Sequence, residues 1–167
     1  MAKLGVIGFG KMAEALWGGF QQEGTHLFCE SHSERTEEIQ SKYPLQSRSL
    51  PDLVKESDII LVCIKPQQVP SLLSQLEQSQ NTSPTPLWVS ICAGTQVATY
   101  EHVLGDNTPI VRVMPNTPIL IQEGMSALYF NKACTQQHQT TIQELFKPTG
   151  RTLTLNNETL IDSVTGI

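Results

Sequence analysis

A glycine-rich turn near the start of the chain has the spacing of a phosphate-binding loop. Gly8 and Gly10 stand two residues apart, and Ala13 follows where a third glycine is often found. The first glycine permits a tight turn, and the second lets a phosphate approach the bare backbone. Amide groups at the start of the next helix then face the anion at the positive end of the helix dipole. We therefore predict a dinucleotide pyrophosphate site, with a plain structural turn as the alternative. Its residues are Gly8, Phe9, Gly10, Lys11 and Met12.

An acidic residue, Glu30, follows this turn by about twenty residues. At the end of a second strand, its carboxylate would accept hydrogen bonds from the adenosine ribose hydroxyls and repel a 2′-phosphate, which favours NADH. A solvated loop carboxylate is the alternative interpretation. The neighbouring Ser31, His32, Ser33 and Arg35 offer hydrogen bonds to a 2′-phosphate and favour NADPH. The sequence leaves both cofactors open.

Two later segments have the composition expected at the other half of such a site. Lys65 and Pro66 follow the apolar run 59–64. We predict that the lysine side chain lies beside the cofactor. The alternative is a lysine that simply extends into water. In segment 113–118, two prolines flank Asn116 and Thr117 and stiffen the loop. A stiff loop loses little entropy on binding, so it is suited to hold the Asn116 amide toward a nicotinamide. A purely structural proline turn is the alternative.

Residues for acid–base or metal chemistry are not grouped in this sequence. The four cysteines are far apart and form no CxxC pair, which argues against a zinc site and a disulfide framework. The spacing shows no Ser-His-Asp order and no paired carboxylates, so we assign no catalytic and no metal-binding residue. We expect Arg112 to be a structural ion-pair partner. The histidines are expected at the surface: His26, His32, His102 and His138.

Alternating short apolar runs and amphipathic segments predict the elements that would position these residues. Strands are expected at 3–7, 26–30, 58–64, 87–92, 109–114, 124–130 and 151–155. Helices are expected at 12–20, 33–43, 51–55, 67–78, 96–104 and 135–146, with a further helix beginning near 158. Strands alternating with helices indicate an α/β fold with a doubly wound, mostly parallel sheet of the Rossmann type.

In such a sheet, ligands bind at the carboxyl ends of the strands, where the strand order reverses. The segments that follow the predicted strands should therefore meet in space although they are distant in sequence. These segments are 8–12, 30–33, 63–66, 92–94 and 114–117.

The composition and net charge of the chain limit the kinds of molecule that it is expected to bind. The chain has 167 residues, 39% of them hydrophobic and 16% charged, which is typical of a globular domain. A net charge of −5 provides no field to attract nucleic acid or anionic lipid. The longest apolar run, 59–64, is too short to span a membrane. We expect a small-molecule partner and a cytoplasmic protein.

Several motifs together resemble those of pyrroline-5-carboxylate reductases. The most specific is the Met-Pro-Asn-Thr-Pro segment, and the resemblance extends over essentially the whole chain. The matching segments are 8–12, 64–67, 89–94, 112–118, 124–125 and 162–167.

The resemblance implies reduction of the C=N bond of 1-pyrroline-5-carboxylate to L-proline with NADPH or NADH, in proline biosynthesis. Residues 8–12 would hold the pyrophosphate. Lys65, Pro66, Ala93 and Asn116 would line the ribose and nicotinamide side. Relatives place an asparagine near the cofactor where this chain has Leu50, so one polar contact is expected to be lost.

The resemblance also implies a domain that this sequence does not contain. Family members continue into a Ser-Gly-Ser-Gly-Pro motif and an all-helical domain that forms a homo-oligomer and holds most of the imino-acid site. We therefore assign 1–157 to an NAD(P)-binding domain and 158–167 to the start of a connecting helix. The alternatives are another Rossmann oxidoreductase of the β-hydroxyacid dehydrogenase type and a non-catalytic nucleotide-binding module.

Overall fold

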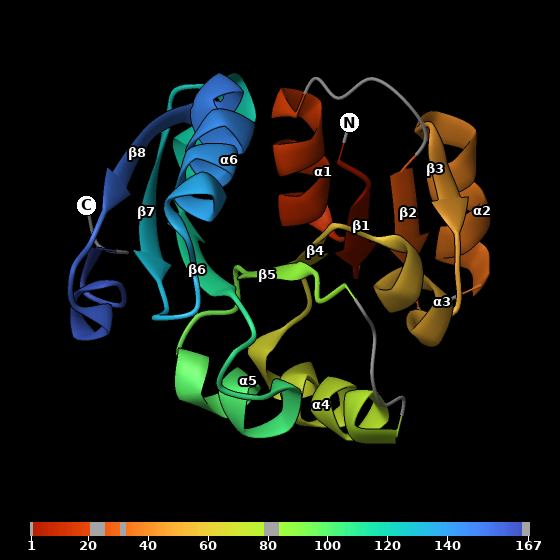
Figure 1. Ribbon diagram of the computed structural model, residues 1–167. Coiled ribbons are helices and arrows are strands. Elements are labelled where there is room, and N and C mark those ends of the chain that lie inside the picture. The colour runs from red at the N-terminus through yellow and green to blue at the C-terminus, as the bar shows by residue number, and fades with distance from the viewer. Residues whose placement is uncertain (1, 21–25, 31–32, 79–83, 165–167) are drawn as a thin grey trace.

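The computed structural model describes residues 2–20, 26–30, 33–78 and 84–164. In this part of the chain one eight-stranded sheet has the order β3-β2-β1-β4-β5-β6-β7-β8, with helices on both faces (Figure 1). The strands are β1 (Leu4–Ile7), β2 (His26–Cys29), β3 (Leu45–Ser47), β4 (Ile59–Val62), β5 (Leu87–Ser90), β6 (Ile110–Pro115), β7 (Gly124–Phe130) and β8 (Gly150–Thr154). The α-helices are α1 (Lys11–Gly19), α2 (Ser33–Lys42), α3 (Leu50–Glu56), α4 (Val69–Gln78), α5 (Val97–Leu104) and α6 (Gln136–Phe146). Short 3-10 helices are η1 (Pro66–Gln68), η2 (Thr117–Ile121), η3 (Lys147–Thr149) and η4 (Glu158–Leu160).

The strand order reverses beside β1. The chain builds β2 and β3 on one side of β1 and then returns to place β4 on the other, with Ile7 opposite both Cys29 and Val62. Strands β1 to β6 pair in parallel, whereas β7 runs antiparallel to β6. The antiparallel pair forms because β6 and β7 are joined through the short η2 and not through a crossover helix long enough to return the chain. The fold class predicted from the sequence is confirmed.

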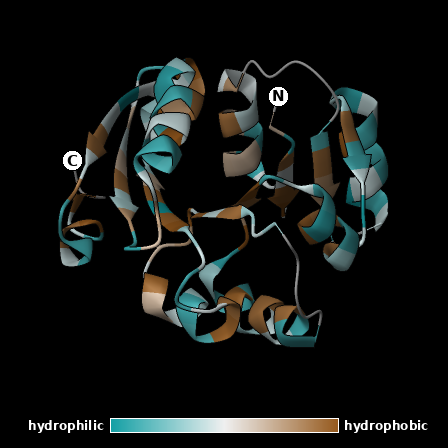
Figure 2. Cartoon of the chain, viewed as in Figure 1, coloured by the Kyte–Doolittle hydropathy of each residue, from teal (hydrophilic) through white to brown (hydrophobic). Residues whose placement is uncertain are grey.

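Two apolar clusters hold the helices against the sheet. On one face, residues of α1 and α6 such as Leu16 and Phe146 pack against alternate strand residues. On the other face, α3, α4 and α5 contribute Leu53, Leu73 and Tyr100 to a second cluster. In Figure 2 the inner strands are largely brown, while α2 is mostly teal. The central strands are thus covered on both sides, as their nearly continuous apolar sequence predicts.

Most predicted elements are confirmed within a few residues, with three differences. Strand β3 was missed because it is only Leu45–Ser47 and has no apolar run of its own. His26 is buried, not exposed, because it opens an inner strand, and its Nδ1 accepts a hydrogen bond from the Leu4 amide at 3.0 Å. The helix expected near residue 158 begins there as the 3-10 turn η4. Residues 165–167 lie outside the described part.

Candidate functional site

Gly8 occupies a position that only glycine fits comfortably. It directly follows β1 and has a φ of +79°. A Cβ atom there would lie 2.7 Å from Ile64 Cγ2 and 2.9 Å from the Cys63 carbonyl oxygen. Residues with a Cβ rarely adopt this φ, and the backbone after β4 leaves no room for the extra atom. The turn is therefore tight because β1 and β4 are adjacent.

Gly10 is the opposite case, because nothing lies within 4 Å of the Cβ that could be added to it. Its φ of −87° is open to other residues, so the glycine is not required by the fold. It is the N-cap of α1 and provides no side-chain cap to the first helical turn. A bare backbone and a helix N-terminus beside open space have the features that bind a pyrophosphate. The site therefore fits a dinucleotide.

Phe9, which lies between these glycines, can present only its backbone to a ligand. Its side chain is 1% exposed and packs in the core, with its ring 5.1 Å from that of Tyr43. The Phe9 amide donates to Glu30 Oε2 at 3.2 Å, and its carbonyl accepts from Arg35 Nη2 at 2.7 Å. The structure thus places the Glu30 carboxylate at the glycine turn. Arg35 also pairs with Glu38 at 2.6 Å.

Hydrogen bonds at the carboxyl ends of the parallel strands bring the predicted segments together. The Gly8 amide donates to the Cys29 carbonyl at 2.9 Å, and the Cys63 amide donates to the Ile7 carbonyl at 2.8 Å. The Ile91 amide continues the row, donating to the Val62 carbonyl at 3.2 Å. Segments 8–12, 63–66 and 92–94 and Glu30 therefore leave the sheet at the same edge. This is the edge at which doubly wound sheets bind nucleotides.

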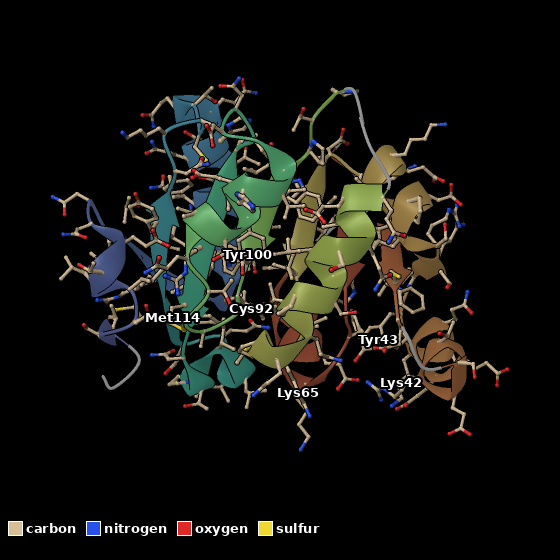
Figure 3. All side chains as sticks on the ribbon, turned by 90° about the horizontal axis from the view of Figure 1, so that it is seen from below. Lys42, Tyr43, Lys65, Cys92, Tyr100 and Met114 are labelled. Carbon is tan, nitrogen blue, oxygen red and sulfur yellow. The ribbon has the colours of Figure 1, made fainter. Side chains whose placement is uncertain are left out.

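Beyond β4, Lys65 and Pro66 are both exposed, and the Lys65 side chain extends into solvent (Figure 3). The Lys65 amide donates to Gln68 Oε1 at 3.0 Å, and its carbonyl accepts from the Gln68 amide at 2.9 Å. These bonds hold the turn that leads into η1. Beyond β5, Ala93 is exposed and the adjacent Gly94 has a φ of +72° with nothing within 4 Å of an added Cβ.

Asn116 fixes the proline-flanked loop after β6. Its Oδ1 accepts a hydrogen bond from the Met125 amide at 2.8 Å, so the carboxamide oxygen ties the loop to the start of β7. The following η2 packs against α1, which lies next to the glycine turn. The carboxamide oxygen thus has a structural partner, and the expected orientation of the Asn116 amide toward a nicotinamide stays a prediction.

Thiols near this edge are not activated. Burial, reinforced by the Glu30 charge, raises the pKa of Cys29, and burial raises the pKa of Cys63 well above its ordinary value. Both therefore stay protonated at neutral pH and are poor nucleophiles. Among the described residues, no group of three His, Cys, Asp or Glu side chains has the arrangement of a metal site. No helix in that part is long and apolar enough to cross a membrane.

Two residues discussed from the sequence, Leu50 and Arg112, have positions that bear on the site. Leu50 is buried in the apolar cluster under α3 and α4. Arg112 is buried and paired with Glu158 and Asp162, which confirms its predicted structural ion pairing. Ser31 and His32 lie outside the described residues. Glu158 and Asp162 could not be recognised from the sequence, because their partners lie far away along the chain.

Residues 3–94 match the family model described as NADP oxidoreductase, coenzyme F420-dependent. The chain belongs to this family. The matched region contains the glycine turn, Glu30, Lys65 and Ala93, so the family assignment rests on the same segments that meet at the sheet edge.

Individual proteins related to this chain are similar to it over nearly its whole length. The pyrroline-5-carboxylate reductase of Methanosarcina acetivorans is 32% identical over 171 residues, which are 99% of this chain and 62% of that protein. The crystal structure of the Streptococcus pyogenes 1-pyrroline-5-carboxylate reductase superposes with a TM-score of 0.85 at 28% identity, covering 97% of this chain and 61% of that one. The Plasmodium falciparum pyrroline carboxylate reductase with NADP bound has a TM-score of 0.78 at 25% identity, covering 93% and 58%. The chain thus spans about three fifths of the length of these relatives.

Proposed function

We propose that this chain is the cofactor-binding part of a pyrroline-5-carboxylate reductase. The observation that carries the proposal is the open N-terminus of α1 at Gly10, which offers backbone donors and no side chain to an anion. The likeness to reductases over nearly the whole chain, one of them with NADP bound, supports the substrate assignment. The reaction is reduction of 1-pyrroline-5-carboxylate to L-proline.

The residues of the chain bind and orient the cofactor and do no acid–base work. Of the predicted residues Gly8, Phe9, Gly10, Lys11 and Met12, the first two shape the turn, because their amides already bind Cys29 and Glu30. The backbone amides of Gly10, Lys11 and Met12 hold the pyrophosphate, and the exposed Lys11 adds positive charge beside it. When bound, the reduced nicotinamide would supply a hydride to C5 of the pyrroline ring, and the ring nitrogen would take up a proton. Orientation of bound reactants alone lowers a barrier by about 7–11 kcal/mol, so positioning is a sufficient role for this domain.

The nicotinamide side of the site consists of the segments after β4, β5 and β6. There, Lys65, Pro66, Ala93 and Asn116 line the ribose and nicotinamide. Glu30 serves the adenosine ribose, because its carboxylate already lies at the Phe9 amide next to the pyrophosphate position. Its negative charge favours NADH, whereas Arg35 beside it favours NADPH, and binding measurements with both cofactors decide between them.

The rest of the reductase site belongs to a further domain. Since the chain spans about three fifths of its relatives, we assign 1–157 to the cofactor domain and 158–167 to a connection toward a helical, homo-oligomeric domain. That domain would bind the substrate carboxylate. We place the protein in the cytoplasm with other biosynthetic reductases.

Calorimetric titration of the 167-residue chain with NADPH and NADH tests the proposal, followed by a steady-state assay with 1-pyrroline-5-carboxylate. We expect saturable binding of at least one cofactor and little or no turnover until the helical domain is supplied. Failure to bind either cofactor would remove the proposed function. Substantial turnover by this chain alone would instead refute the division of labour between domains.

A further inference from the structure

A buried arginine in β6 connects the end of the described chain to the edge of the sheet. Arg112 is 1% exposed, and its Nη1 and Nη2 pair with Glu158 Oε1 at 3.2 Å and Asp162 Oδ1 at 2.8 Å. A buried guanidinium is costly unless it is paired, so these two carboxylates are needed where they stand. Between them, Ile161 is fully buried against Met114 and Ala127. The segment 158–162 is therefore docked through Ile161 and the two carboxylates.

The same two carboxylate oxygens also accept backbone amides from the loop after β5. Glu158 Oε1 accepts from the Val97 amide at 2.7 Å, and Asp162 Oδ1 accepts from the Gly94 amide at 3.4 Å. Val97 begins α5, and the N-cap residue Gln96 gives that helix no side-chain cap. The N-terminus of a helix attracts an anion, and for α5 this anion is the carboxylate of Glu158, which lies 61 residues away in sequence.

One of these amides belongs to the loop that would face the nicotinamide, and the other directly follows it. The loop contains Ala93, and it leaves β5 at the edge where Gly8 and Cys63 also leave the sheet. At Gly94 the backbone has a φ of +72° with open space where a Cβ would be, so the loop is not packed from that side. Its shape therefore depends on the two amide contacts and on Ser90. The Ser90 hydroxyl accepts from the Cys92 amide at 3.3 Å and lies 2.6 Å from the Tyr100 hydroxyl. Figure 3 labels Tyr100 and Cys92, whose side chains lie next to each other.

We propose that Glu158 and Asp162 are positioning residues for the nicotinamide half of the cofactor site. They hold the loop 93–96 through the Gly94 and Val97 amides, and Arg112 anchors both carboxylates. The proposal rests on the proposed function, because it assumes that this loop contacts the nicotinamide. It predicts that the carboxylates control the affinity for the nicotinamide part of the cofactor and not for the adenosine part.

Replacing Glu158 in two ways separates positioning from stability. Glu158→Ala removes the acceptor for both the Val97 amide and Arg112, whereas Glu158→Gln keeps an oxygen that can accept both bonds and loses only the charge. Asp162→Ala and Asp162→Asn form a second pair at a more exposed side chain, for use if Glu158→Ala fails to fold. Each variant is titrated with NADPH and NADH and with ADP-ribose, which lacks the nicotinamide, and its thermal unfolding is recorded.

For the Ala variants we expect the affinity for the better-bound nicotinamide cofactor to fall about tenfold while that for ADP-ribose changes less than about twofold. The Gln and Asn variants should recover most of the loss. Equal losses for ADP-ribose and the full cofactor would indicate general destabilisation and overturn the proposal. Unchanged affinity in both Ala variants would also overturn it. If the wild-type chain binds neither nicotinamide cofactor, the proposed function itself fails, which is a distinguishable result.

Discussion

Replacing Gly10 by valine should remove cofactor binding and leave the fold intact. No atom lies within 4 Å of the position of an added Cβ, and the φ of −87° is accessible to valine. Because valine is a poor N-cap, the free energy of unfolding should fall by about 1 kcal/mol at most. The same branched side chain would occupy the space through which a phosphate reaches the α1 amides.

The expected loss of affinity follows from the hydrogen bonds that become unavailable. A hydrogen bond to a charged group contributes about 1.5–3 kcal/mol, so losing two amide–phosphate bonds costs about 3–6 kcal/mol. This corresponds to a decrease of roughly a hundredfold to ten-thousandfold in cofactor affinity. Calorimetric titration with NADPH and NADH measures it directly, and thermal unfolding monitors the fold.

Gly18→Val in the same helix is the matched control. Gly18 is exposed, and an added Cβ there also meets nothing within 4 Å, but it lies two turns away from the glycine turn. This variant should bind the cofactor like the wild type. Unchanged affinity in Gly10→Val, or an equal loss in both valine variants, would refute the assignment of the pyrophosphate to the N-terminus of α1.

Three further perturbations test other parts of the argument. Gly8→Ala should lower the free energy of unfolding, measured by chemical denaturation, by about 2–4 kcal/mol. Alanine is strained at a φ of +79°, and its Cβ overlaps Ile64 and the Cys63 carbonyl. A decrease below about 1 kcal/mol would contradict this account. Glu30→Ala should shift the ratio of NADH to NADPH affinity about tenfold toward NADPH, because it removes a ribose acceptor and a negative charge. The control Glu37→Ala, on the surface of α2, should leave this ratio unchanged. An unchanged ratio in Glu30→Ala would remove the role assigned to Glu30. Burial raises the pKa of Cys134 to about 11, so the folded state holds a proton that the unfolded state releases near pH 9. Stability should therefore fall as the pH rises from about 9 to 11, less steeply in Cys134→Ala; equal slopes would exclude this thiol as the cause.

The first half of the site was predictable because its requirements are local. A glycine turn needs a strand before it, a helix after it and two bare backbone positions, and all of these lie within residues 4–19. The sequence even indicates different roles for the two glycines, and the structure separates them, since Gly8 is enclosed and Gly10 is open. Strands β1 and β2 then pair in parallel with Ile7 opposite Cys29, and this register places Glu30 at the turn.

The parts that could not be predicted depend on contacts between distant segments. The short β3 forms because Leu45 pairs beside His26, and its own three residues have no strand pattern. His26 is buried for a similar reason, since it packs against Trp17 of α1 and binds the Leu4 amide. Asn116 has the expected loop position, but its oxygen is bound to the Met125 amide across the η2 connection. Propensity and spacing contain no information on such pairings.

The two halves of the site are therefore held by interactions of different kinds. The glycine turn is built on the central strands β1 and β4, whose residues are buried on both faces, so it can open only if the core opens. The loop 93–96 is held at one side by two carboxylates on a segment whose other residues, such as Leu160, are partly exposed. Local opening occurs first where few buried contacts must break, so detachment of that segment costs less than opening of the sheet. If the cofactor is bound by its pyrophosphate, it would thus stay in place while the loop at its nicotinamide end is released.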